Sequence, residues 1–147
     1  MSKGIYVRQA GVAVYVHAAW ATWDRLPLLT GEVERAAHRA LTAKCRDLGA
    51  EVVALGGIED HVHLLVKLPA TLPLASLIGQ IKGASSHLIT HLPGDSEHLF
   101  KWQGAYGAVS VSPQALGDVA AYITHQRARH AAQTLIAEWE PPAPREP

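Results

Sequence analysis

The sequence predicts an α+β fold: a ferredoxin-like, RRM-like antiparallel sheet in the order β-α-β-β-α-β, followed by one additional C-terminal helix. Three observations predict it. Four short segments are rich in Val and other residues that strands favour. Three longer segments repeat apolar residues every three or four positions, as helices do. Their order along the chain is that of the split β-α-β motif, whose sheet we expect to carry its helices on one face.

The first half of the chain supplies three strands and one helix. Residues 11–21 combine Val, Tyr, Ala and Trp and are predicted as the first strand. Residues 32–48 have helical spacing, and Gly49 stands where a glycine commonly ends a helix. Residues 51–57 and 61–68 are predicted as two strands joined by a short turn. Both faces of the first strand carry side chains that could contact other parts of the protein. We therefore expect an edge strand that is able to pair with a second chain.

The second half supplies the remaining elements. Residues 74–92 are predicted as a helix and residues 106–111 as the fourth strand. Ser112 is a good helix N-cap and Pro113 is tolerated at a first helical position, so the last helix should run from there to about His130. Residues 140–147 contain four prolines, which cannot form a ladder. We therefore predict one domain over residues 1–132 and a flexible tail over residues 133–147.

Composition narrows the class of protein. The chain has 147 residues, 48% of them apolar and 18% charged, which fits one folded domain and excludes a disordered chain. The single cysteine, Cys45, excludes a disulfide framework and a cysteine-based zinc module. No apolar run is long enough for a membrane span, and no secretory leader is recognisable. We expect a cytoplasmic protein with no membrane partner.

Two histidines on the third strand are candidate metal ligands. Side chains alternate across a strand, so His61 and His63 share one face and could chelate one divalent metal. Asp60 could orient one of the two rings. The alternative is a solvated strand face that happens to carry two histidines. A metal site would also need a third ligand, and two imidazoles suit Zn²⁺ or Ni²⁺ as well as harder metals.

The last helix carries a second group of candidates. Tyr122 and Gln126 are four residues apart and share one flank, which Arg129 and His130 continue. A tyrosine beside an apolar stripe can be a residue at the edge of the core. It can also be a nucleophile, and the side-chain oxygen of Gln126 is a suitable ligand for Mg²⁺ or Mn²⁺.

Five stretches in order resemble one known family. They are residues 15–22 (YVHAAWAT), 60–66 (DHVHLLV), 80–86 (QIKGASS), 100–112 (FKWQGAYGAVSVS) and 122–126 (YITHQ). Together they make the chain similar to the HUH-type single-tyrosine transposases. These include the small transposases of insertion sequences that move as single-stranded DNA, and the REP-associated tyrosine transposases.

The resemblance implies roles and partners. His61, His63 and Gln126 match the family's metal ligands, with Mg²⁺ or Mn²⁺ as the metal, and Tyr122 matches its nucleophile. The implied activity is cleavage and rejoining of single-stranded DNA through a 5′-phosphotyrosine. The implied substrate is single-stranded DNA with hairpins. The implied assembly is a homodimer with composite active sites, in which the tyrosine helix of one subunit completes the histidine site of the other.

The charge balance departs from a typical DNA-binding protein. Thirteen basic and thirteen acidic residues give a formal net charge of zero. Contacts with DNA phosphates would then depend on a few cations, for which Lys82, Lys101, Arg127 and Arg129 are the candidates.

Three points stay open at the level of sequence. No base for the tyrosine stands out, although His125 and His130 are candidates. A catalytically silent or domesticated DNA-binding dimer is an alternative function. A histidine-triad phosphohydrolase would need a third histidine at position 65, where Leu65 stands.

Overall fold

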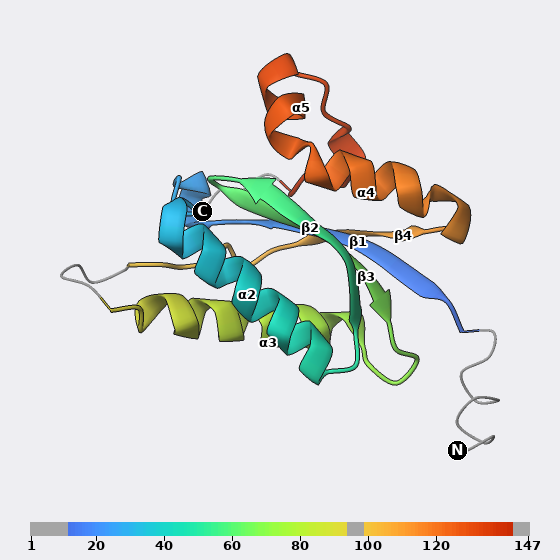
Figure 1. Cartoon of the computed structure of the whole chain (residues 1–147), viewed down its shortest axis with the longest axis horizontal. Helices are drawn as coiled ribbons and strands as arrows, with labels where there is room; N and C mark the ends of the chain where they lie inside the picture. The colour runs from blue at the N-terminus through green and yellow to red at the C-terminus, as the bar shows by residue number, and fades with distance from the viewer. Residues whose placement is uncertain (1–11, 94–98, 143–147) are drawn as a thin grey trace.

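Four strands form one sheet in the spatial order β2-β3-β1-β4, and every neighbouring pair is antiparallel (Figure 1). The computed structural model describes residues 12–93 and 99–142. The strands are β1 (Val14–Ala21), β2 (Glu51–Ile58), β3 (His61–Leu68) and β4 (Gly107–Val111). This order is the split β-α-β arrangement, so the predicted fold class is confirmed. Gly11, at the start of the first predicted strand, lies outside the described residues.

One expectation about the sheet is wrong. The first strand was expected at an edge, but β1 lies between β3 and β4 and is paired on both sides. The edges of the sheet are β2 and β4. Pairing of β1 with a second chain is therefore excluded while β4 stays in place, because its backbone groups are already used.

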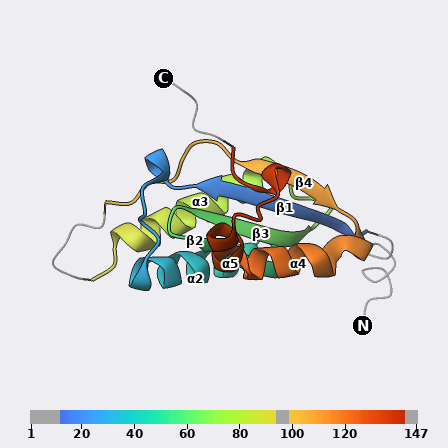
Figure 2. The same cartoon turned by 90° about the horizontal axis from the view of Figure 1, so that it is seen from above.

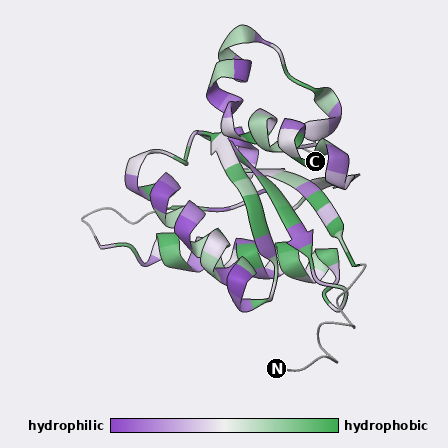
Figure 3. Ribbon diagram, turned by 45° about the vertical axis from the view of Figure 1, so that its right-hand side comes forward, coloured by the Kyte–Doolittle hydropathy of each residue, from purple (hydrophilic) through white to green (hydrophobic). Residues whose placement is uncertain are grey.

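Two long helices cover one face of the sheet. They are α2 (Gly31–Asp47) and α3 (Leu74–Thr90), which lie side by side beneath the strands in Figure 1. Gly49 follows α2 with φ +77°, the left-handed conformation expected of a glycine that ends a helix. Alternate residues of the central strands, such as Trp20 and Leu64, are buried against these helices. Figure 3 shows the resulting concentration of hydrophobic residues along the strands, with hydrophilic residues on the outer side of α2.

The opposite face carries α4 (Leu116–Thr124) and α5 (Gln126–Ala132). We expected a single helix from Ser112 to about His130, and that expectation is wrong. A 3-10 turn, η2 (Pro113–Ala115), precedes α4, and Ser112 makes no side-chain capping bond. The helix then breaks at His125, whose backbone leaves helical geometry and whose ring Nδ1 lies 2.7 Å from the carbonyl oxygen of Ala121. The backbone N–H of His125 bonds to the same carbonyl oxygen at 3.1 Å, so ring and backbone share one acceptor at the break.

Residues 133–142 continue over the same face. Beyond α5 they include a 3-10 turn, η3 (Ala137–Trp139), which lies against β1 and β4 (Figure 2). The division into a domain over residues 1–132 and a flexible tail stays a prediction, and residues 143–147 lie outside the described residues. A short 3-10 turn, η1 (Trp23–Arg25), follows β1. Within residues 12–93 and 99–142, no helix is long and apolar enough to cross a membrane.

Candidate active site

Strand β3 places both candidate histidines beneath α4, α5 and the segment that follows. His61 pairs with Ala21 of β1, and His63 pairs with Ala19 of β1 and Gly56 of β2. These small neighbours leave room for two imidazole rings, whose centroids are 4.9 Å apart. Both histidines are fully buried, which argues against the alternative of a solvated strand face.

Each ring has a partner at Nδ1. Oδ1 of Asp60 lies 2.7 Å from Nδ1 of His61, so Asp60 makes the contact expected of it. Burial raises the pKa of Asp60, but hydrogen bonds from His61 and Arg25 outweigh burial and hold that pKa below its ordinary value. Nδ1 of His63 lies 2.9 Å from Nε2 of His17, a buried residue of β1. Both candidate ligands therefore direct Nε2 away from these partners and into the site.

The C-terminal half of α4 brings Tyr122, and the start of α5 brings Gln126, to the same place. Gly56 allows this approach, because a Cβ there would clash with the carbonyl oxygen of Ile123. Beyond the helix break, Nε2 of Gln126 donates to the carbonyl oxygen of Tyr122 at 3.3 Å. This bond turns Oε1 of Gln126 towards Nε2 of His61, 3.2 Å away.

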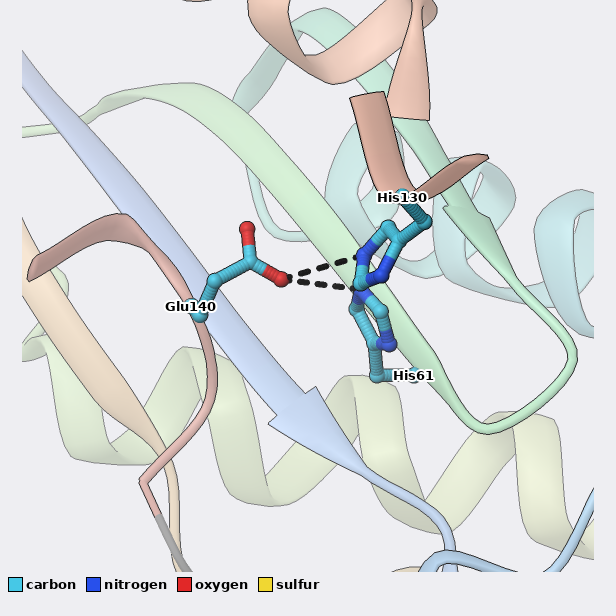
Figure 4. A group of neighbouring side chains, drawn as sticks. All are labelled: His61, His130 and Glu140. Atoms are coloured by element: carbon cyan, nitrogen blue, oxygen red, sulfur yellow. Dashed lines mark hydrogen bonds and ion pairs between the residues drawn. The ribbon is translucent and has the colours of Figure 1, made fainter. Parts of the chain in front are cut away.

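Two further side chains complete a cluster of possible metal ligands. His61, His130 and Glu140 bring a ligand atom each within 4.8 Å of one another. Figure 4 shows the three side chains converging on one place. Oε1 of Glu140 lies 3.4 Å from Nε2 of His61 and 3.2 Å from Nε2 of His130. Nε2 of His130 is 3.0 Å from Oε1 of Gln126.

The spacing of this cluster fits a divalent metal. Ligands about 2.1 Å from a metal lie about 3.0–3.4 Å from their neighbours in tetrahedral or octahedral geometry. The imidazole, amide and carboxylate groups are of the types that bind Mn²⁺, Mg²⁺ or Zn²⁺. Among the described residues, Nε2 of His63 is buried and makes no hydrogen bond, and Oε2 of Glu140 lies 3.4 Å from it, so this nitrogen is available to a metal. The residues present therefore fit the implied cofactor.

Tyr122 lies at the edge of this cluster and is fully buried. Its hydroxyl donates to Oε2 of Glu140 at 2.5 Å and accepts the backbone N–H of Ile136 at 2.9 Å. The guanidinium of Arg129 lies over its ring, 4.6 Å from the centroid. Burial and the hydrogen bond to Glu140 raise the pKa of Tyr122, so the resting phenol is held in its protonated form.

The charges of the cluster are mutually dependent. Burial lowers the pKa of His61, but hydrogen bonds to Asp60, Glu140 and Gln126 outweigh it and raise that pKa overall. Burial lowers the pKa of His63. Burial raises the pKa of Glu140, yet contacts with His61, His63 and Tyr122 reverse this and hold the pKa well below its ordinary range. Glu140 is therefore a carboxylate anion, and the groups around it stabilise its negative charge.

Two of the four candidate DNA-binding cations are engaged within the fold. Lys82 donates to the backbone carbonyl oxygen of Gln103 at 2.5 Å. Burial lowers the pKa of Lys82. Arg127 forms ion pairs with Glu34 and Glu59.

The other two lie over aromatic rings. Lys101 places Nζ 4.1 Å from the ring centroid of Trp23, and Arg129 covers the ring of Tyr122. Arg129 therefore lies beside the candidate nucleophile, whereas Lys101 lies beside η1. The role of these four residues in DNA binding stays a prediction.

Sequence reasoning missed three members of the site. The only sequence signal for His17 was the alternation of side chains along β1, which places His17 and Ala18 on opposite faces of the sheet. His130 was considered as a base but not as a ligand, although it follows Gln126 by four residues on the same flank. Glu140 was assigned to the tail, and no local pattern marks it. His125, the other candidate base, is exposed and has its ring bonded within α4.

Comparison with known proteins assigns the family. A family model described as IS200-like transposase matches residues 11–126. The chain belongs to the IS200-like transposase family. This family of HUH tyrosine transposases is the one that the five stretches resemble, so that prediction is confirmed.

Individual relatives agree with this assignment. The transposase for insertion sequence element IS200 of Salmonella typhimurium is 25% identical over 114 residues, which cover 75% of this chain and 74% of that protein. The ISDra2 transposase TnpA of Deinococcus radiodurans is 27% identical over 114 residues, covering 75% of this chain and 81% of the relative.

Two solved structures resemble this IS200-like chain. A crystal structure assigned as a transposase from Deinococcus radiodurans R1 has a TM-score of 0.63 and 27% identity, covering 84% of this chain and 95% of the other. A REP-associated tyrosine transposase bound to a REP hairpin has a TM-score of 0.61 and 19% identity, covering 81% and 68%. At 19% identity, the likeness to the REP-associated transposase shows a shared fold and nothing more.

Proposed function

We propose that the chain is a metal-dependent single-strand DNA endonuclease and strand transferase with Tyr122 as its nucleophile. One observation carries this proposal. A single carboxylate, that of Glu140, lies 2.5 Å from the hydroxyl of Tyr122 and 3.4 Å from Nε2 of both His61 and His63. The candidate nucleophile and the candidate ligands are thus separated by the width of one small anion, which a phosphodiester could replace.

The chemistry follows from the phenol. Its oxygen forms a bond to phosphorus while the bond from phosphorus to the 3′ oxygen breaks. The phenolic proton ends on the 3′ oxygen, so a 3′ hydroxyl leaves and the 5′ side stays attached to Tyr122. A 3′ hydroxyl of a second strand reverses these changes, frees Tyr122 and joins the strands without an energy cofactor.

His61, His63 and Gln126 would hold the metal, with His130 within reach of the same position. Mg²⁺ or Mn²⁺, when bound there, supplies a Lewis acid for the phosphate oxygens. Asp60 and His17 hold the two histidine rings in the orientation this requires.

The proposed substrate is single-stranded DNA with hairpins, as the family resemblance implies. The REP-associated relative bound to a REP hairpin supports this choice. Arg129, beside Tyr122, and Lys101 would supply phosphate contacts. Lys82 and Arg127 would add to them after leaving their partners within the fold, which are the carbonyl oxygen of Gln103 for Lys82 and two glutamates for Arg127.

The decisive experiment detects the covalent adduct. Wild-type protein with Mn²⁺ and labelled single-stranded DNA should give a protein–DNA band that survives denaturation and disappears with chelator. Tyr122→Phe should form no adduct yet still bind DNA. Tyr106→Phe is the matched control, because Tyr106 packs against the apolar cluster on the other face of the sheet, and it should behave as the wild type. DNA binding without any adduct in the wild type would favour the catalytically silent alternative.

A second experiment concerns the homodimer with composite sites. The structure of one chain brings Tyr122 and Gln126 to the histidines of that same chain. In a composite dimer, a heterodimer of His61→Ala and Tyr122→Phe chains would contain one complete site and regain adduct formation. If heterodimers form and stay inactive, each site is built within one chain.

A further inference from the structure

The segment that follows α5 turns back across the site. Gln133 adopts the left-handed conformation, with φ +56°, and thereby ends α5. The N–H of Thr134 donates to the carbonyl oxygen of Arg129 at 3.0 Å. The chain then passes over β1 and β4 through η3, and Pro142 lies beside Gly107 of β4 (Figure 2).

Three groups of this segment enclose the nucleophile. Glu140 accepts the hydroxyl proton of Tyr122, and the N–H of Ile136 donates to the same oxygen. Trp139 packs edge-on against the ring, with centroids 4.9 Å apart. Tyr122 has no exposed surface as a result. A phosphodiester cannot reach this hydroxyl while residues 136–140 stay in place.

The carboxylate of Glu140 also occupies the place of the reacting group. One oxygen faces Nε2 of His61 and His130 at 3.4 and 3.2 Å. The other faces Nε2 of His63 at 3.4 Å and the hydroxyl of Tyr122. A phosphodiester likewise shares one negative charge between two oxygens, so DNA and Glu140 compete for the same partners.

We propose that residues 134–140 are an internal pseudosubstrate, which keeps the site closed until single-stranded DNA displaces it. This inference rests on the proposed function, because the phosphodiester is the group displaced. It also gives residues 133–142 a role that differs from that of a passive tail.

The first test measures DNA affinity without cleavage. Labelled, mixed-sequence single-stranded DNA is titrated with full-length protein in EDTA. Glu140→Gln should raise the affinity about tenfold, since the internal anion is lost. Glu138→Gln, an exposed residue of the same segment with the same charge change, should alter it less than about twofold. Equal effects of the two variants, or no effect of Glu140→Gln, would overturn the proposal.

Two further measurements remove the remaining ambiguity. A synthetic peptide of residues 134–142 should compete with DNA for the Glu140→Gln protein, and the same peptide with Gln in place of Glu140 should not. With Mn²⁺, Glu140→Gln should form the adduct faster than the wild type. Loss of the adduct in this variant alone would make Glu140 a catalytic group and overturn the proposal. Absence of the adduct in every variant would refute the proposed function. The measurement of DNA affinity in EDTA would still show whether Glu140 and DNA compete for the site.

A separate observation assigns a positioning role to His17. Nε2 of His63 can present a lone pair to a metal only if the proton of the neutral ring is on Nδ1. In that tautomer Nε2 of His17, 2.9 Å away, accepts the proton, and His17 carries its own proton on Nδ1. We infer that His17 sets the tautomer of His63, as Asp60 does for His61.

The test compares two replacements of His17. His17→Ala removes the acceptor and should weaken Mn²⁺ binding, measured by calorimetry, about 10–100-fold. His17→Gln keeps an acceptor oxygen and should restore most of the affinity. If both variants bind Mn²⁺ like the wild type, or if both lose it equally, the positioning role is wrong.

Discussion

On β3, Val62, Leu64 and Val66 face α2 and α3, whereas His61, His63 and Leu65 face α4, α5 and the C-terminal segment. All six are buried. The first face is held by apolar contacts, which need no particular partner atom. The second has a smaller apolar cluster that includes Leu65, but its two histidines depend on specific hydrogen bonds among side chains from four separate parts of the chain. Equal burial therefore serves stability on one face and chemistry on the other.

The largest expected effect tests the stability of the first face. Leu64→Ala should lower the free energy of unfolding by about 2–5 kcal/mol, because it leaves a cavity in a fully buried apolar cluster. His63→Ala, one residue away on the other face, should cost about 1 kcal/mol, since the polar groups around it can take up water. Denaturant melts of the two variants decide this. Equal losses would mean that the histidine face is core as well.

The next effect tests the chemistry of the second face. His61→Ala and His63→Ala should each weaken Mn²⁺ binding by more than about 100-fold, measured by calorimetry, because each removes a candidate ligand. His87→Ala, on the exposed side of α3, is the control and should bind metal like the wild type. Normal binding by both site variants would leave His130 and Glu140 as the principal ligands.

Acid should weaken the second face selectively. Burial and the neighbouring His63 lower the pKa of His17 from 6.5 to about 4. Between these values His17 binds more of a proton in the unfolded chain than in the folded one. The free energy of unfolding should therefore fall as the pH drops from 6.5 towards 4, by up to about 3 kcal/mol. Melts in EDTA should show this decline in the wild type and a shallower one in His17→Gln. Parallel curves would show that other groups carry the acid response.

The smallest expected effect concerns the reactivity of the one thiol on the first face, that of Cys45. Burial raises the pKa of Cys45 to about 11, and its side chain extends from α2 into the apolar cluster. At pH 8 the folded protein should react with a thiol reagent about 100-fold more slowly than the protein unfolded in guanidinium. Rapid reaction of the folded protein would mean that α2 opens readily from the sheet.

Strand-favouring composition, helical periodicity and the order of the elements were enough to predict the sheet and its two covering helices. Alternation along a strand was enough to predict that His61 and His63 share one face. The motif order was enough to predict the family. Tyr122 and Gln126 were named from a four-residue spacing that a helix makes meaningful. These features are local, or depend on patterns that repeat within one element, so the sequence displays them directly.

Other features depended on which segments meet in space. The sequence by itself determined the element order, the apolar core and the family, and it named four candidate site residues. Only the tertiary structure placed β1 at the centre of the sheet, broke the last helix at His125, paired His17 with His63, and carried Glu140 into the site. The physical reason is that a hydrogen bond between distant residues leaves no periodic trace in a sequence. The prolines after Glu140 indicate that this stretch forms neither a helix nor a strand ladder. They do not indicate which surface of the protein it contacts.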